Sequence, residues 1–183
     1  MVNKTEFYRV LTPGEAKAII KAIPKRNHKM CFRTSLYSGM RYIEAKRFGE
    51  HPEWFRPERN MVIIPKKFTK TKYERKVNLT PQFSEMLTIY LEGDSELKYP
   101  SYQSWNKNLS RWAQRAGIED YINVSAGTTC KTWESWLFES GFNVMRILAS
   151  QGHDSMTSLK HYYSNSWTPN ERYEIKMETS GWE

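Results

Sequence analysis

The sequence of 183 residues is long enough for one domain with a full hydrophobic core, and no part of it resembles a signal peptide or an apolar run that could span a bilayer. Two cysteines, Cys31 and Cys130, are too few for a disulfide framework and lack zinc-finger spacing, which favours a reducing cytoplasm. A formal net charge of +8 with 14% aromatic residues indicates a polyanionic partner such as nucleic acid, although a helical protein that is merely solubilised by its basic residues remains an alternative.

The first predicted helix has a complete start signal. Thr12 can cap it, Pro13 occupies its first position and Glu15 completes a capping box. Apolar residues follow at helical spacing, and Pro24 ends the run. A second helix is predicted over residues 29–38.

A third helix is predicted to begin near residues 39–40, in the segment "SGMRYIEAKRF". It carries Arg41, buried in its first turn, and Glu44 three residues later. Side chains at this spacing are neighbours on a helix, so an ordinary ion pair would explain both residues without any function.

A basic hairpin follows this helix. "MVIIP" is typical of a strand, and "KVNL" of its antiparallel partner. The connection "KKFTKTKYER" is too long for a tight turn and carries Lys66, Lys67, Lys70 and Lys72. It is either a solvated loop or one that contacts phosphate.

Four further helices are predicted up to His153. "TPQFSEMLTIYL" has Thr80 as its cap, "SYQSWNKNLSRWAQRAG" ends at Gly117 and "KTWESWLFESG" ends at Gly141. "NVMRILASQG" has Asn143 as its cap and ends at Gly152. Another helix is predicted after His153, and the polar tail contains a short one from about Pro169. The fold class is therefore mainly α with a small β-hairpin or sheet (α+β), in a single domain.

Four features follow one another along the sequence: an arginine on a helix, lysines on a β-hairpin, a Gly-His pair at a helix end, and a tyrosine nine residues after the histidine. "YSGMRYIEA" resembles the "TGLRxSEL" box of tyrosine recombinases (phage-type integrases), and "GHDSMTSLKHY" resembles their "GHSSxxTTxxY" box. The resemblance covers about residues 11–164, and "HYY" and "KTWESWL" are most similar to integrases of archaeal viruses and plasmids. It implies a catalytic core of this family, with DNA cleavage and rejoining like those of type IB topoisomerases.

The resemblance implies a role for each matching residue. Tyr162 attacks a DNA phosphodiester and forms a 3′-phosphotyrosyl link, while Arg41 binds the phosphate bidentately. Lys70 protonates the leaving 5′-oxygen, His153 hydrogen-bonds the phosphate, and Glu44 orients its neighbours. Because arginine neutralises the phosphate charge, we expect neither a metal nor another cofactor.

Two of these assignments leave alternatives open. On a helix that begins after the histidine, Tyr163 falls on the apolar face and Tyr162 about 100° away, which favours Tyr162 as the nucleophile; both could also be packing residues. Lys70 is expected at the tip of the hairpin, but counting from "MVIIP" favours Lys66, and Lys72 also stays open.

The family's second box, "HxxR", is not preserved. The matching stretch "GTTCKTWESWL" has Gly127 at the histidine position and Cys130 at the arginine position. Lys131 is a poor substitute for the arginine, because adjacent helical residues point about 100° apart. We expect Lys131 to contact DNA instead, together with Lys66, Lys67 and Lys72. Three explanations stay open: an engineered replacement of arginine, a native cysteine in a weak or inactive enzyme, or an incorrect register.

The resemblance also implies partners. These are double-stranded DNA at attachment sites and further copies of the chain, with a tetramer on two duplexes in the host cytoplasm. Residues 165–183 would form a tail that docks on a neighbouring protomer, and the family's N-terminal DNA-clamping domain is absent, as in a fragment. The alternative is a non-catalytic DNA-binding module of the same fold, with Cys130 native.

Overall fold

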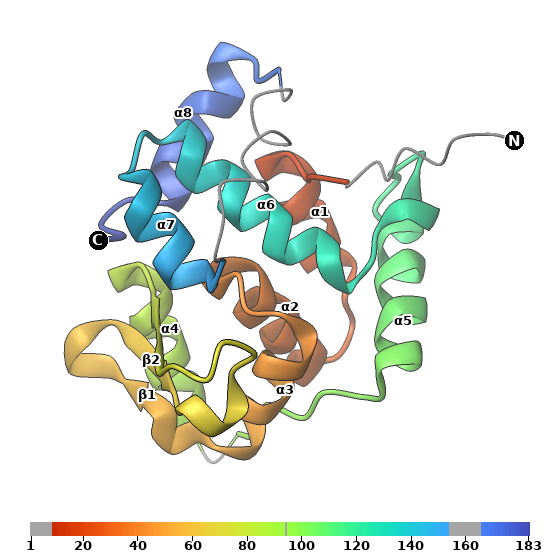
Figure 1. Ribbon diagram of the computed structural model, residues 1–183. Helices are drawn as coiled ribbons and strands as arrows, with labels where there is room; N and C mark the ends of the chain where they lie inside the picture. The colour runs from red at the N-terminus through yellow and green to blue at the C-terminus, as the bar shows by residue number, and fades with distance from the viewer. Residues whose placement is uncertain (1–8, 94, 154–165) are drawn as a thin grey trace, which may run out of the picture.

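The computed structural model describes residues 9–93, 95–153 and 166–183 of the chain. These residues form helices and one small antiparallel sheet (Figure 1), which confirms the predicted mainly α fold. The helices are α1 (Pro13–Ala22), α2 (Arg26–Ser38), α3 (Tyr42–Glu50), α4 (Pro81–Glu92), α5 (Tyr102–Arg115), α6 (Ala126–Glu139), α7 (Val144–Gln151) and α8 (Pro169–Glu178). The strands are β1 (Phe55–Arg56), β2 (Met61–Ile64) and β3 (Arg75–Asn78), and the 3-10 turns are η1 (Pro52–Trp54), η2 (Pro57–Arg59), η3 (Lys66–Phe68) and η4 (Tyr121–Asn123).

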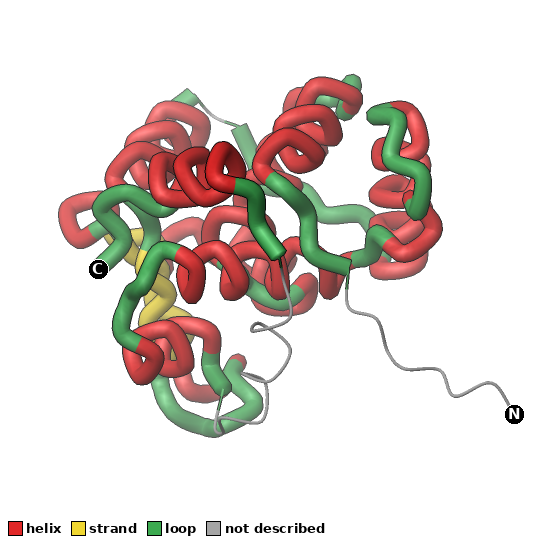
Figure 2. Tube along the Cα trace, turned by 90° about the horizontal axis from the view of Figure 1, so that it is seen from above, coloured by secondary structure: helices red, strands yellow, loops and turns green. Residues whose placement is uncertain are grey.

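Helix α6 lies at the centre of the molecule, in contact with α2, α5, α7 and α8 (Figure 1). Figure 2 shows the strands on one side of a largely helical molecule, and β3 contacts α7 there. The largest fully buried side chains are the tryptophans Trp105, Trp133, Trp136 and Trp182. Within the described ranges, every helix is too short or too polar to cross a bilayer.

Side-chain caps set the starts of several helices. At α1, Thr12 Oγ1 accepts from the Glu15 N–H and the Glu15 carboxylate accepts from the Thr12 N–H, which confirms the predicted capping box. At α4 a single bond forms the cap, in which Thr80 Oγ1 accepts from the Phe83 N–H, and Asn143 Oδ1 caps α7 by accepting from the Met145 N–H. Helix α2 begins at Arg26, three residues earlier than predicted, because its start has no side-chain cap that a sequence could reveal.

The predicted hairpin forms two strands of a three-stranded sheet. Val62 of β2 lies opposite Val77 of β3, and both are buried. Strand β1 pairs with the other edge of β2 and was not predicted, since two residues are too few to show alternation. The inward face of β3 holds Arg75 beside Val77, so a charged side chain occupies a position where an apolar one is usual.

The C-terminal tail packs on its own chain, and its predicted short helix is confirmed as α8. Ile175 and Trp182 are fully buried, and Trp182 Nε1 donates to the backbone oxygen of Asn78 at 3.0 Å. Lys17 of α1 forms an ion pair with Glu174 of α8 at 3.3 Å. Docking of the tail on a neighbouring protomer stays a prediction, and it would require these contacts to open.

Candidate active site

Arg41 stands at the corner between α2 and α3. The chain leaves α2 through Gly39 in the left-handed conformation (φ 64°), and a Cβ at this position would collide with the side chain of Gln151 on α7. Glu44 Oε2 accepts from the Arg41 backbone N–H at 2.9 Å and caps α3. The prediction that Arg41 is buried in the first turn is wrong, because Arg41 is the N-cap residue and its side chain is 40% exposed. Since only the backbone N–H is used in the cap, the guanidinium can extend toward α7.

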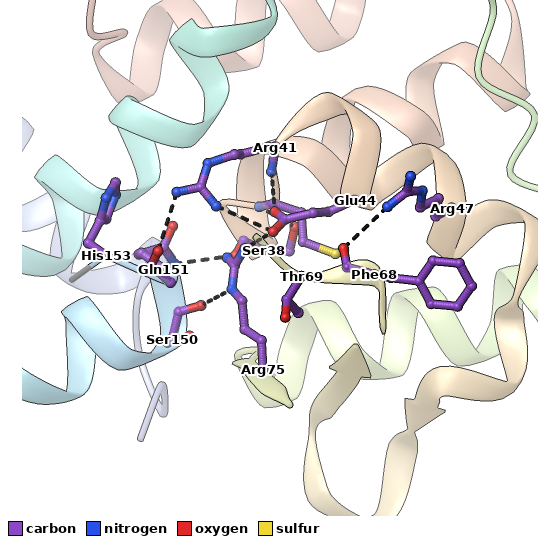
Figure 3. Close-up of polar contacts among 12 residues, drawn as sticks. Ser38, Arg41, Glu44, Arg47, Phe68, Thr69, Arg75, Ser150, Gln151 and His153 are labelled. Carbon is purple, nitrogen blue, oxygen red and sulfur yellow. Dashed lines mark hydrogen bonds and ion pairs between the residues drawn. The ribbon is translucent and has the colours of Figure 1, made fainter. Parts of the chain in front are cut away.

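Glu44 connects two arginines through one oxygen. Its Oε1 accepts from Arg41 Nη1 at 3.3 Å and from Arg75 Nη1 at 2.5 Å, and the carboxylate is only 6% exposed. Figure 3 shows both guanidinium groups directed at the Glu44 carboxylate, with the Arg41 side chain above that of Arg75. Sequence reasoning missed Arg75. The signal that could have revealed it is the alternation along β3, which places this arginine on the same face as Val77.

The C-terminal end of α7 receives both guanidinium groups. Helix α7 ends at Gly152 in the left-handed conformation (φ 66°), and the His153 N–H donates back to the Leu148 oxygen at 3.0 Å. Arg75 Nε donates to the Ser150 oxygen at 2.8 Å, and Arg41 Nη2 donates to the Gly152 oxygen at 3.4 Å. The last carbonyls of a helix have no partner inside it and carry partial negative charge, so cations are stable here.

His153 faces a second buried carboxylate. Its Nε2 lies 3.2 Å from Glu134 Oε2 of α6, and the side chains of His153 and Glu134 are 26% and 1% exposed. A carboxylate accepts hydrogen bonds, so this contact places a proton on Nε2. Nδ1 is the ring nitrogen that takes no part in the contact with Glu134. His153 is therefore neither a helix cap by its side chain nor a core residue.

Cys130 lies among these charges. The pKa of its thiol is raised to about 11, by burial first and by the Glu134 carboxylate second, while the Arg41 and Arg75 guanidinium groups act in the opposite direction. Glu134 follows Cys130 by one helical turn of α6, so both residues face the same site. The structure thus brings position 130 near Arg41, as the proposed register requires; its former role as an arginine position stays a prediction.

The lysines lie on the exposed connection between β2 and β3. Lys70 and Lys72 are in the turn that follows η3, and Lys66 and Lys67 are in η3 itself. Phe68 anchors this connection: its ring packs on Trp54 at 5.1 Å, and its backbone oxygen accepts from Arg47 at 3.2 Å (Figure 3). Lys131 is half-buried on α6. Tyr162 and Tyr163 lie outside the described residues, so their assignment stays a prediction.

The site brings together four predicted residues and adds two that were not predicted. Arg41, Glu44, Cys130 and His153 come from α3, α6 and the end of α7, although the sequence separates them by up to 112 positions. Arg75 and Glu134 complete the polar network. An arrangement of donors around a half-exposed arginine can bind an anion such as a phosphate.

Comparison with known proteins gives a family and a fold. The profile described as the phage integrase family matches residues 9–168, and no curated protein matches. Several solved structures are similar, among them two Xer recombinases and a transposon integrase. The XerH site-specific recombinase, bound to palindromic difH substrate after cleavage, has 16% identity and a TM-score of 0.67, over 94% of this chain and 53% of that one. The XerA recombinase has 13% identity and a TM-score of 0.62, over 93% of this chain and 63% of that one.

The third similar structure is the Tn1549 transposon integrase in complex with transposon right end DNA. It has 15% identity and a TM-score of 0.66, over 98% of this chain and 68% of that one. The chain therefore spans about half to two thirds of the length of these proteins. At such identities the likeness establishes the fold.

Proposed function

The chain belongs to the phage integrase family, and on this premise we propose that it is the catalytic domain of a site-specific recombinase that cuts and rejoins double-stranded DNA. Its fold, mostly helical with a small three-stranded sheet, is that of tyrosine recombinase catalytic domains. One observation supports the proposal above the others: Arg41, Cys130 and His153 come from three separate segments and meet around the buried carboxylates of Glu44 and Glu134.

The proposed reaction is a transesterification. The hydroxyl oxygen of Tyr162 attacks phosphorus, the bond to the 5′-oxygen breaks, and the phosphate stays on the enzyme as a 3′-phosphotyrosyl ester. Lys70 gives a proton to the departing 5′-oxygen, and a base takes the tyrosine proton. In rejoining, a 5′-hydroxyl attacks the ester and tyrosine leaves, so the bond energy is kept and no ATP is needed.

Arg41 suits the role of phosphate donor. Its contacts in the free chain are long, 3.3 Å to Glu44 Oε1 and 3.4 Å to the Gly152 oxygen, and such hydrogen bonds are weak. A half-exposed guanidinium held this weakly can exchange its partners for the charged oxygens of a phosphate, which form stronger bonds. His153 can add a donor from Nδ1 when both ring nitrogens carry a proton, because the Nε2 proton is engaged by Glu134.

Cys130 would then mark a missing second donor. A thiol offers at most one weak hydrogen bond, whereas arginine offers a fork of charge-assisted ones. In this interpretation the chain is a slow enzyme, because loss of one preorganised donor costs about 10²–10³ in rate.

The proposed partner is double-stranded DNA at specific attachment sites, together with further copies of the chain. The XerH and Tn1549 structures contain DNA, and the chain itself carries a net charge of +8. We propose a tetramer on two duplexes in the host cytoplasm, with the Lys66, Lys67, Lys72 and Lys131 side chains on DNA phosphates. The "HYY" and "KTWESWL" segments favour integration of a viral or plasmid genome, of archaeal origin.

The alternative is a DNA-binding module of this fold that does not cleave. The neutral Cys130 favours it, because the thiol adds no charge to the place where the transition state has most. Both functions predict DNA binding, and only the first predicts a covalent adduct.

The test is to trap that adduct. Duplexes enriched from a randomised library by binding to the chain are nicked near each position, so that the short 5′-product diffuses away and cleavage cannot reverse. Proteolysis and mass spectrometry should then find the DNA on Tyr162, for the chain or for its Cys130→Arg variant. Tyr162→Phe should abolish the adduct, and an adduct on Tyr163 that survives in Tyr162→Phe would refute the assignment.

A further inference from the structure

Arg41 and Arg75 have the same two kinds of partner and hold them differently. Each donates to Glu44 Oε1 and to a terminal carbonyl of α7. For Arg75 the distances are 2.5 Å to Glu44 Oε1 and 2.8 Å to the Ser150 oxygen, and its side chain is 5% exposed. For Arg41 they are 3.3 Å to Glu44 Oε1 and 3.4 Å to the Gly152 oxygen, with 40% exposure. One arginine is therefore fixed inside the protein and the other is loosely held at its surface.

The difference follows from competition for one carboxylate. An ionised Glu44 that is almost fully buried needs a charged, hydrogen-bonded partner, since an unpaired charge in the protein interior is strongly destabilising. Arg75 meets this need from β3, inside the protein. If Arg75 were absent, the remaining partner in contact with the carboxylate would be Arg41, three residues away on the same helix.

We propose that Arg75 is a positioning residue that keeps Arg41 available for a phosphate. Arg75 does so by neutralising the Glu44 carboxylate and by bonding to a terminal carbonyl of α7. Two guanidinium groups around one carboxylate leave one positive charge in excess, and the tighter bonds of Arg75 place that excess on the exposed Arg41. The proposal rests on the proposed function, in which Arg41 binds the scissile phosphate.

Two further observations agree with a fixed Arg75. A Cβ at Gly152 would lie 3.1 Å from Arg75 Cδ, so the glycine that ends α7 also makes room for the arginine. Arg75 Nη2 is buried and has no hydrogen-bond partner among the described residues, whereas no nitrogen of Arg41 is buried in this way. The protein thus accepts an unsatisfied donor in order to keep Arg75 inside, which is costly for a residue that serves packing alone.

Binding of inorganic phosphate is the first measurement, because it requires neither a DNA sequence nor tyrosine chemistry. Titration calorimetry at constant ionic strength, with chloride as the competing anion, should show that Arg75→Gln binds phosphate about 10- to 100-fold more weakly than the chain, close to Arg41→Gln. Arg75→Lys, which keeps the charge beside Glu44, should retain most of the affinity. Arg56→Gln removes an exposed arginine of β1 and is the matched control, with affinity unchanged.

The double variant Glu44→Gln/Arg75→Gln decides the mechanism. A glutamine can still cap α3 but does not hold Arg41 by charge, so phosphate affinity should return to that of the chain. This variant lacks both members of the buried pair and should fold even if Arg75→Gln does not, since removal of both charges avoids an unpaired one. If the double variant binds phosphate as weakly as Arg41→Gln, Arg75 contributes directly and the proposal is wrong. Unchanged affinity in Arg75→Gln would refute it too.

Cleavage of nicked DNA separates this inference from the proposed function. Single-turnover rates should follow the phosphate affinities across the same variants. If phosphate binding shows the expected pattern but neither the chain nor Cys130→Arg ever forms an adduct, the recombinase function fails and the role of Arg75 stands. If adducts form at equal rates with and without Arg75, only the role of Arg75 fails.

Discussion

Cys130 occupies the position on α6 that faces both site arginines, and it adds no charge there. The thiol is buried, and its pKa is raised to about 11 by burial first and by the Glu134 carboxylate second. It therefore stays neutral at physiological pH and can act on a phosphate only as a weak donor. Glu134 Oε1 is buried without a hydrogen-bond partner among the described residues, so an acceptor is already in place for a longer, donating side chain.

We expect Cys130→Arg to raise the cleavage rate by about 10²–10³, because the second guanidinium binds charge that develops in the transition state. DNA affinity should change little, since many other basic residues contribute to it. Cys130→Met adds length without charge and should leave the rate unchanged. If the unmodified chain already cleaves as fast as Cys130→Arg, or if Cys130→Arg is unfolded in a thermal melt, Cys130 is a core residue instead.

The same thiol predicts how stability changes in alkaline solution. In the unfolded chain it ionises near pH 9, but in the folded chain it keeps its proton to about pH 11. Between these values the folded state binds more protons, so the free energy of unfolding falls as pH rises, by about 2 kcal/mol up to pH 10.5. Denaturant unfolding at pH 8 and pH 10.5 should show a smaller loss for Cys130→Ala than for the chain. Equal losses would mean that the thiol is accessible to water.

At the scale of single elements, the connection between β2 and β3 combines an anchored part with an exposed part. Phe68 packs on Trp54 and His51, and Arg47 lies over its ring and bonds to its backbone oxygen. Lys70 follows two residues later in the turn and is exposed. A lysine on a short turn beside such an anchor can enter a DNA groove without displacing the sheet.

We expect Lys70→Ala to cleave normal DNA slowly but to cleave a substrate with a 5′-bridging sulfur at nearly the normal rate. A thiolate leaves without a proton, so the general acid is no longer required. Lys66→Ala and Lys72→Ala serve as controls, with similar effects on both substrates. If Lys70→Ala is equally slow on both, its role is electrostatic, and recovery by the sulfur substrate in Lys66→Ala would move the assignment to Lys66.

At the scale of the whole molecule, the sequence predicts what depends on local chemistry. The caps at Thr12, Thr80 and Asn143 are confirmed, because each bond joins residues two or three positions apart. The partners of the site are not local. Arg75 contacts Ser150, which is 75 positions away in the sequence. The alternation along β3 indicates that Arg75 faces inward, but nothing in either segment identifies Ser150 as its partner.

The register of position 130 is intermediate between these cases. The match of "GTTCKTWESWL" to the family's second box predicted that position 130 belongs to the phosphate site with Arg41, and the structure places both in one charged cluster. The pairing of His153 with Glu134 was not predicted, because it depends on how α6 and the end of α7 pack. Recognition of the family thus depends on local motifs, whereas the contacts of Arg75 and Glu134 with the predicted site residues depend on the tertiary fold.

The net charge of +8 permits a final prediction about the molecule as a whole. If the basic residues bind DNA phosphates, each contact releases counterions, and log K falls with log salt with a slope of about −0.9 for each phosphate contacted. Six contacts give a slope of about −5, measured by fluorescence anisotropy of a labelled duplex between 50 and 200 mM salt. Lys70→Ala should make the slope less negative by no more than about 0.9, the value of one phosphate contact. Cys130→Arg should make it more negative by at most about the same amount. A slope near zero would mean that the charge only solubilises a helical protein, and both the recombinase and the DNA-binding module would be excluded together.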